Sequence, residues 1–443
     1  MTAKLRRSLA EYSVVFRHWP PLALIVVATL LTQSAYAMIT PTLPLYLRTA
    51  RLGTPLLAIG FIFAAYAIAE TLFKAPGGAV GDRWGRTRVA LAGLVVGTIS
   101  PVLMTVVHRW EFFVPLRAID GLGVALVWPT MMALIGEKMP SQDRALAMSL
   151  FNLPYLGGLI LGMAAGLRIG DVTGDNRYVF YTSSALLLVA AVCMVVMALW
   201  DRAWQRRQPP AADPPRPPVV LTEDDGPLSR CWWDRLRRLR ERQGTLLNML
   251  WIFLFVQMGA SLVIPILTIY ARDGLGLTQT GMVKLFAIPG LLAAALALPL
   301  GRAADRLGRS RAIQGGLAIG AVGFGLLPLA GSTAWLVVVL MSMLGVSYVV
   351  VMPAWMALTS QLAPAGRQGL VLGAMNTSQG VGFVVASLLG AGLYGLNRAA
   401  PFYLAGILLA VCAVLCTFLI HEPHDDASAS GPESSTLPVH CPR

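Results

Sequence analysis

An arginine and an aspartate stand three residues apart in the apolar stretch VPLRAIDGLGVALVWP. At this spacing Arg117 and Asp120 share one face of a helix, where their side chains can pair. Ionisable side chains in apolar surroundings are costly and often mark an ion pathway or a ligand site. Two interpretations remain open: the pair handles a proton or a ligand, or it is a self-neutralised structural pair.

A second charged pair lies in the stretch AYAIAETLFKAPGG. Glu70 precedes Lys74 by four residues, which is the favourable orientation for an ion pair on a helix. Again two interpretations stand. The pair supports the neighbouring segment structurally, or Glu70 is a site for a proton.

Two short segments concentrate glycine and charge between apolar stretches. We call GGAVGDRWGRTRVA (77–90) the first charged turn and GRAADRLGRSRAI (301–313) the second. Glycines permit tight turns and close backbone approach, and a carboxylate can pair with arginine or cap a helix. Equivalent residues stand 223 positions apart, and they are Gly78 and Gly301, Asp82 and Asp305, Arg83 and Arg306, Gly85 and Gly308, and Arg86 and Arg309.

The composition identifies the elements that position these residues as membrane helices. The chain has 443 residues, of which 56% are hydrophobic and 13% charged, whereas soluble domains carry about 25% charged residues. Apolar runs of about 20 residues can each span a bilayer as a helix. We predict an all-α membrane protein with twelve such spans, at residues 21–46, 55–75, 88–107, 112–136, 145–167, 178–200, 246–270, 279–300, 312–330, 334–360, 368–393 and 401–420.

The constant offset predicts a duplicated architecture. Pairs outside the charged turns, such as Arg144 with Arg367 and Pro129 with Pro353, keep an offset of 223 or 224. We therefore expect two pseudo-symmetric six-helix bundles, with a substrate site between them. The expected domains are an N-terminal bundle (1–200), a cytoplasmic Pro/Arg-rich linker (201–245), a C-terminal bundle (246–420) and a disordered cytoplasmic tail (421–443).

Lysine and arginine indicate the orientation. With the N-terminus inside, 25 of the 35 Lys and Arg residues fall in inner segments and 7 in outer loops, as the positive-inside rule requires. We expect a multi-pass protein of the inner (plasma) membrane with both termini cytoplasmic and no cleaved signal peptide. The net charge of +13 then reflects topology and contact with anionic lipid, and we expect no nucleic-acid partner.

The pattern G-x-V-G-D-R-x-G-R-x-R of the first charged turn resembles the signature loop of the major facilitator superfamily. The resemblance implies a gating role at the cytoplasmic face for the paired glycines, aspartates and arginines of both turns. The sequence R-x-x-D-G-x-G resembles that family's fourth-helix motif, whose arginine is associated with proton coupling. Asp120 stands where that motif usually has a glutamine-like residue, and this departure makes Asp120 a candidate proton carrier. The end of the first span, MITPTLPLYL, resembles the drug:proton antiporter branch, and LPYLGG (153–158) partly matches the antiporter motif.

Uncharged polar residues near the middle of the spans are candidates for lining a cavity, although each is equally suited to a helix–helix hydrogen bond. They are Gln33, Tyr36, Asn152, Tyr155, Gln257, Tyr348, Asn376 and Gln379. A cavity with few fixed charges suits apolar or weakly polar compounds.

We expect a secondary transporter, not an enzyme, with no cofactor and no metal site, because neither a phosphate-binding loop nor a cluster of metal ligands is present in the sequence. The favoured function is proton-coupled efflux of a small hydrophobic or amphipathic organic compound by a monomer. Two alternatives are uptake of a small metabolite by a symporter or uniporter, and a membrane sensor or scaffold that transports nothing.

Overall fold

A computed structural model describes residues 16, 18–49, 52–140, 143–206, 231–331, 333–362 and 368–419. Within these ranges the chain is helical and contains no strand. The helices are α2 (Leu22–Leu47), α3 (Leu56–Trp84), α4 (Arg86–Val106), α5 (Phe113–Lys138), α6 (Arg144–Thr173), α7 (Arg177–Gln205), α8 (Cys231–Ser261), α9 (Leu267–Asp273), α10 (Gln279–Leu307), α11 (Arg309–Leu326), α12 (Ala334–Leu362), α13 (Gln368–Leu396) and α14 (Ala400–Leu419), with short 3-10 turns at Trp110–Phe112 and Leu327–Ala330.

Eleven helices of the described chain are long and apolar enough to cross a membrane, and the apolar part of α8, Leu246–Ser261, is shorter. The predicted span at 246–270 is wrong in one respect, because the structure divides it. Helix α8 ends at Ser261, residues 262–266 form turns, and α9 follows. Pro265, which lacks a backbone N–H, lies in this break. Pro41, which stands 224 positions earlier and so is equivalent to Pro265 in the duplicated sequence, is accommodated within the continuous helix α2.

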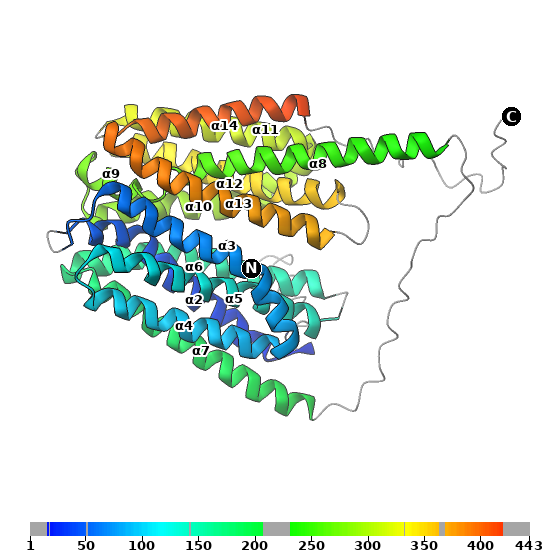
Figure 1. The fold of residues 1–443 in the computed structure, drawn as a ribbon, viewed down its shortest axis with the longest axis horizontal. Coiled ribbons are helices and arrows are strands. Elements are labelled where there is room, and N and C mark those ends of the chain that lie inside the picture. Colours follow the sequence, from blue (N-terminus) through cyan, green and yellow to red (C-terminus); the bar gives the residue numbers. More distant parts are fainter. Residues whose placement is uncertain are drawn as a thin grey trace, which may run out of the picture.

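Figure 1 shows helices α2–α7 and helices α8–α14 as two layers lying side by side. We call these layers the N-half and the C-half, and we keep the expected domain boundaries as a prediction. The contacts between the halves run mainly from α3 to α13 and from α6 to α10. The end of the layers that holds Gly85 and Gly308 is called the inner end, because the charge distribution predicts that it faces the cytoplasm; the opposite end is the outer end.

Buried apolar side chains join the two halves at the outer end. One cluster combines the outer parts of α2 and α3 with the C-half, through residues such as Leu47, Phe63, Ile269 and Trp355. The inner part of the N-half forms a separate cluster around Leu94, Val127 and Met194. The apolar core is therefore shared between the halves at one end and divided at the other.

The two charged turns have the same backbone geometry. Gly85 has φ 94° and ψ 129°, and Gly308 has φ 93° and ψ 139°. A positive φ strongly favours glycine because it lacks a Cβ, so each glycine allows one helix to end and the next to begin directly. The expectation of an extended charged turn at 77–90 is corrected: residues up to Trp84 are helical, and only Gly85 interrupts the helix.

Two glycines let α5 pack tightly against two neighbours. A Cβ at Gly121 would meet the backbone of α3, including the Glu70 nitrogen at 3.0 Å. A Cβ at Gly123 would lie 3.0 Å from the Gly93 oxygen of α4 and 3.0 Å from the Tyr36 hydroxyl. Because helices can approach this closely only where side chains are absent, the motif D-G-x-G fixes α5 between α3 and α4 and places Asp120 in the interior.

The linker is partly helical. Helix α7 continues to Gln205, and α8 already begins at Cys231, so the basic segment 234–243 belongs to the first turns of α8. The Pro-rich residues 207–230 and the tail 421–443 lie outside the described residues.

Candidate functional site

Arg117 and Asp120 form a buried ion pair in the outer part of α5. The Arg117 Nη1 atom donates a hydrogen bond of 2.9 Å to Asp120 Oδ2, and the side chains are 5% and 0% exposed. The aromatic rings of Tyr66 and Phe63 lie 4.4 Å and 5.8 Å from the guanidinium carbon. The helical spacing therefore brings the two charges together as predicted, inside a shell supplied by α3.

This pair leaves hydrogen-bonding capacity unused. Among the described residues, Asp120 Oδ1, Arg117 Nε and the Tyr36 hydroxyl are buried without a partner. Tyr36 interacts electrostatically with both Asp120 and Arg117. Because unpaired buried polar groups are costly, three of them at one place indicate a site that receives a further partner, such as a proton, a water molecule or a ligand.

A chain of polar groups leads from this pair toward the C-half. Glu70 accepts a hydrogen bond of 2.9 Å from Lys74, and both side chains are partly exposed. Tyr155 of α6 interacts electrostatically with Glu70 and with Tyr348 of α12, and its ring packs edge-on against Trp128 at 5.1 Å. The predicted residues Tyr36, Glu70, Tyr155 and Tyr348 thus form a series of polar side chains, each within electrostatic range of the next, between Asp120 and the opposite half.

At the inner end the first charged turn is joined to its own half. Arg86 pairs with Asp82 at 2.5 Å and with Glu137, at the end of α5, at 2.6 Å. Asp82 is 59% exposed, and Arg83 is exposed. Of the two roles expected for the carboxylate, Asp82 takes the pairing with an arginine, and that arginine is Arg86. Glu137, which the sequence analysis missed, completes the cluster and is recognisable only once α5 lies beside α4.

The glycines of the charged turns divide into two kinds. A Cβ at Gly81 would lie 2.9 Å from Thr130 of α5, whereas Gly78 and Gly301 have no atom within 4 Å of a Cβ position. The close approach expected at Gly78 is therefore not made in this structure. In the second turn, Arg306 is exposed and Arg309 is partly buried, and the side chain of Asp305 lies outside the described residues.

Contacts between the halves concentrate toward the outer end. A Cβ at Gly60 of α3 would meet the Ser387 oxygen of α13 at 2.5 Å, and Thr71 fills the space at Gly380. Arg168 of α6 donates to Thr280 of α10 at 2.8 Å, and Thr280 donates to Asp171. Beyond Thr71, toward the inner end, Gly78 faces open space. The halves are closed together at the outer end and are apart where α3 reaches Gly78.

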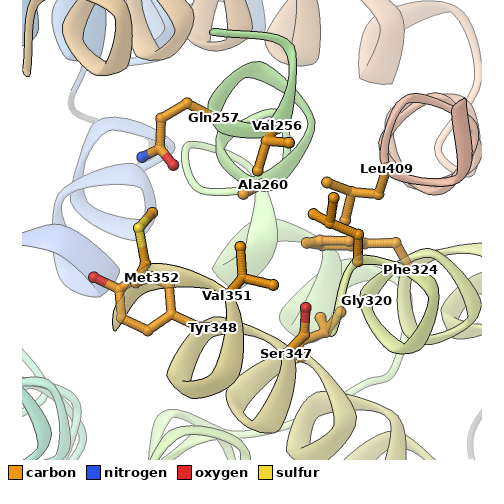
Figure 2. Close-up of a pocket in the computed structure, with 12 residues that line it drawn as sticks. Val256, Gln257, Ala260, Gly320, Phe324, Ser347, Tyr348, Val351, Met352 and Leu409 are labelled. Atoms are coloured by element: carbon orange, nitrogen blue, oxygen red, sulfur yellow. The ribbon is translucent and has the colours of Figure 1, made fainter. Parts of the chain in front are cut away.

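A pocket of about 590 Å³ lies within the C-half. Figure 2 shows Gln257 and Tyr348 on one side of this pocket and Phe324 and Leu409 on the other. Its lining combines apolar side chains with the polar groups of Gln257, Ser347 and Tyr348. The sequence does not single out Ser347, Phe324 and Met352, because residues of these types are frequent in every span.

The eight predicted lining residues do not share one cavity. Gln257 and Tyr348 line the pocket. Gln33 and Tyr36 are buried among the helices of the N-half, Tyr155 and Gln379 are partly buried, and Asn152 and Asn376 are exposed. The Asn376 amide donates to the Leu372 carbonyl of its own helix at 3.0 Å, which is a local role. A hydrogen-bonding function within the helical packing therefore fits several of them better than ligand binding.

Comparisons with known proteins agree over the length of the chain. The family model described as "Major Facilitator Superfamily" matches residues 25–278 and 249–440. Multidrug resistance protein 2 of Bacillus subtilis (strain 168) is 24% identical over 396 residues, which is 88% of this chain and 93% of that protein. Quinolone resistance protein NorA of Staphylococcus aureus (strain MRSA252) is 28% identical over 160 residues, 36% of this chain and 40% of NorA.

Solved structures share the fold at lower sequence identity. The crystal structure of a D-xylose-proton symporter has a TM-score of 0.71 and 18% identity, covering 90% of this chain and 97% of that one. The inward open conformation of the xylose transporter XylE from E. coli has a TM-score of 0.69 and 17% identity, covering 92% and 98%. The arrangement of helices is therefore that of these transporters.

Proposed function

The chain is a transporter of the major facilitator superfamily, and on that premise we propose that it exports a small hydrophobic or amphipathic organic compound in exchange for protons. The proposal places proton handling at Arg117 and Asp120 and the substrate in the C-half pocket that Gln257 and Tyr348 line. The relatives named for multidrug and quinolone resistance support this direction and substrate class.

The buried pair in α5 is the single observation that carries the proposal. Asp120 is a fully buried carboxylate with one oxygen unpartnered among the described residues. Its negative charge is balanced by Arg117, so that protonation of Asp120 would leave a guanidinium without its counter-ion in apolar surroundings. Because an unpaired charge there is unfavourable, protonation would drive a rearrangement of α5 against α3.

That rearrangement supplies the coupling. Arg117 also packs against the rings of Tyr66 and Phe63 on α3, so a guanidinium released from Asp120 would pull on the helix that contacts α13. Glu70, Tyr155 and Tyr348 extend the polar path into the C-half. We propose that a proton enters at Asp120 from the outer side when the outer ends separate, and leaves toward the inner end when they close.

The substrate class follows from the pocket. Its wall is mostly aliphatic, aromatic and thioether side chains, with an amide, a hydroxyl and a phenol as polar groups. Such a lining offers no fixed charge among its described members to bind a strongly ionic solute. A compound with an apolar body and one or two hydrogen-bonding groups is the best match.

Gating is assigned to the inner end. The proposed latch consists of Asp82, Arg83 and Arg86 with Gly78 and Gly85, and of their counterparts in the second charged turn. On the predicted topology, halves joined at the outer end and apart at Gly78 correspond to the inward-facing arrangement. We propose that Asp82 exchanges its contact with Arg86 for one with the C-half when the inner ends close.

The test uses proteoliposomes with an imposed pH gradient and a fluorescent probe of lumenal pH. We expect that a hydrophobic dye or drug added to one side triggers a proton flux in the opposite direction. Proton and substrate moving in the same direction would instead establish symport. Silence across a panel of dyes, drugs and small metabolites, with folded protein, would reject proton-coupled export.

A further inference from the structure

A polar pocket lies at the outer end, away from the site described above. It has a volume of about 640 Å³ and is lined by Arg48 at the end of α2, Leu56 of α3, Ile269 and Asp273 of α9, and Tyr394 and Arg398 at the end of α13. Both halves of the molecule therefore build its wall.

Three donors around this pocket have unused capacity. Arg48 is exposed and forms no ion pair or hydrogen bond with its side chain within the described ranges. The Arg398 Nη1 atom makes only a long contact of 3.4 Å with the Asp273 backbone oxygen. The hydroxyl of Tyr394, a residue that is 5% exposed, is buried without a partner in the described part of the chain.

These donors line the same pocket. Tyr394 interacts electrostatically with Arg398, with Asp273 and with Arg48. Asp273 supplies the one carboxylate of the described lining, and its Oδ1 atom already accepts a hydrogen bond of 2.8 Å from Arg272. With that carboxylate neutralised, the remaining charge is that of two guanidinium groups facing a phenol.

We propose that this pocket binds a phosphate group. Two guanidinium groups and a hydroxyl that line one pocket provide several N–H and O–H donors for phosphate oxygens, and arginine suits such bidentate recognition. The group can come from free phosphate or from the headgroup of a lipid at the outer surface. Since Arg48 belongs to the N-half and Arg398 to the C-half, a bound phosphate group also favours the state in which the outer ends meet.

The experiment measures binding of radiolabelled inorganic phosphate to the purified full-length protein in a phosphate-free detergent, by scintillation proximity. We expect saturable binding that weakens about tenfold or more in Arg48→Gln and in Arg398→Gln, because each removes charge-assisted hydrogen bonds. Tyr394→Phe removes only the hydroxyl and should weaken binding by a smaller factor. Arg109→Gln is the matched control, since Arg109 is an exposed arginine paired with Glu111 outside the pocket.

A second arm distinguishes the source of the phosphate group. Phosphatidic acid and diacylglycerol, which differ in the phosphate group, are each added to the micelles, and thermal unfolding is followed. If a lipid is the ligand, phosphatidic acid alone raises the unfolding temperature, and Arg48→Gln and Arg398→Gln abolish the rise. Should either glutamine variant fail to fold, Arg48→Lys and Tyr394→Phe provide the comparison. Absence of specific binding in both arms, or equal loss in Arg109→Gln, would overturn the proposal.

Discussion

Asp120 combines complete burial with an unpartnered carboxylate oxygen. A buried ion pair contributes little net stability, because desolvation offsets the attraction, but removing one partner of a buried pair costs about 3–5 kcal/mol. A single substitution at Arg117 or Asp120 would therefore lower both the stability of the fold and the rate of transport. Separating the two roles requires a variant in which no buried charge remains.

Such a separation is available at Arg117 and Asp120. We expect Asp120→Asn to lower the free energy of unfolding by about 3–5 kcal/mol, because the Arg117 charge stays buried without its partner. The double variant Arg117→Met/Asp120→Asn should recover most of that stability. Proton-driven transport should be lost in both, which thermal unfolding and flux in proteoliposomes would measure. A stable double variant with normal coupling would show that the pair is only structural.

At the inner end, Asp82 should behave differently because it is exposed and its one ion pair with a described residue is with Arg86. Exposed ion pairs contribute about 0–1 kcal/mol, so Asp82→Asn should leave stability within about 1 kcal/mol of the original. We expect a transport rate reduced about tenfold or more with nearly unchanged substrate affinity, since the proposed latch acts when the inner ends close.

The control for Asp82 is Asp175→Asn, which changes a partly exposed aspartate beside Arg177 at the outer end. Asp175 Oδ1 accepts a hydrogen bond of 2.9 Å from the Arg177 backbone N–H, which the asparagine oxygen can also accept. Transport and binding should both be unaffected in this control. If Asp82→Asn reduced substrate binding as much as transport, the residue would belong to the substrate site and not to the gate.

At the scale of elements, the helix pairs α3–α4 and α10–α11 each depend on a single glycine with positive φ. Non-glycine residues pay about 1–2 kcal/mol in the left-handed region. At Gly85 no atom lies within 4 Å of a Cβ position, so a side chain there would gain no contact to offset that cost. The two copies therefore share backbone angles as well as sequence. In each copy a single glycine joins two antiparallel helices without a loop.

We expect Gly85→Ala and Gly308→Ala each to lower the free energy of unfolding by about 1–2 kcal/mol. Gly78→Ala and Gly301→Ala serve as matched controls, because both positions are helical and have open space around a Cβ. Alanine favours a helix over glycine by about 0.5–1 kcal/mol, so the controls should be neutral or slightly stabilising. Chemical denaturation in detergent would measure all four, and equal destabilisation in the controls would contradict this account of the turns.

For the whole molecule, the apolar core explains which end is closed. The cluster that includes Leu47, Phe63 and Ile269 crosses from one half to the other at the outer end, while the inner part of the N-half has its own cluster. Alternating access requires that the contact surface be exchanged between the ends. At the inner end, glycines with open space around their Cβ positions, such as Gly78, leave room for the two halves to pack together when that end closes.

Gly78→Leu tests this exchange. In the arrangement described here, a larger side chain at Gly78 meets no atom within 4 Å of its Cβ, so the folded protein should form with unchanged thermal stability. Transport should fall about tenfold or more, because the added side chain would prevent close packing when the inner ends approach. The matched control is Gly315→Leu on α11, a helical glycine that also faces open space. Normal transport by Gly78→Leu would remove Gly78 from the gate.

The sequence alone determined the membrane class, the helical architecture, the duplication and both intramembrane ion pairs. These features depend on local regularities: runs long enough to cross a bilayer, a constant offset, and charges three or four residues apart on a helix. The same local rules predicted one continuous span at 246–270, and there they failed. A proline can be accommodated in a helix, as Pro41 is, or can coincide with a break, as Pro265 does, and packing decides between the two.

Only the tertiary structure decided which residues from different helices meet. Glu137 joins Arg86, the C-half pocket gathers side chains from four helices, and Arg48 comes to share a pocket with Arg398. In membrane spans apolar composition is nearly uniform, so that a residue facing lipid, a partner helix or a cavity carries the same sequence signal. Whether a residue faces lipid, another helix or a cavity depends on how each helix is rotated about its axis. Close packing at small residues fixes that rotation, and this packing exists only in the assembled bundle.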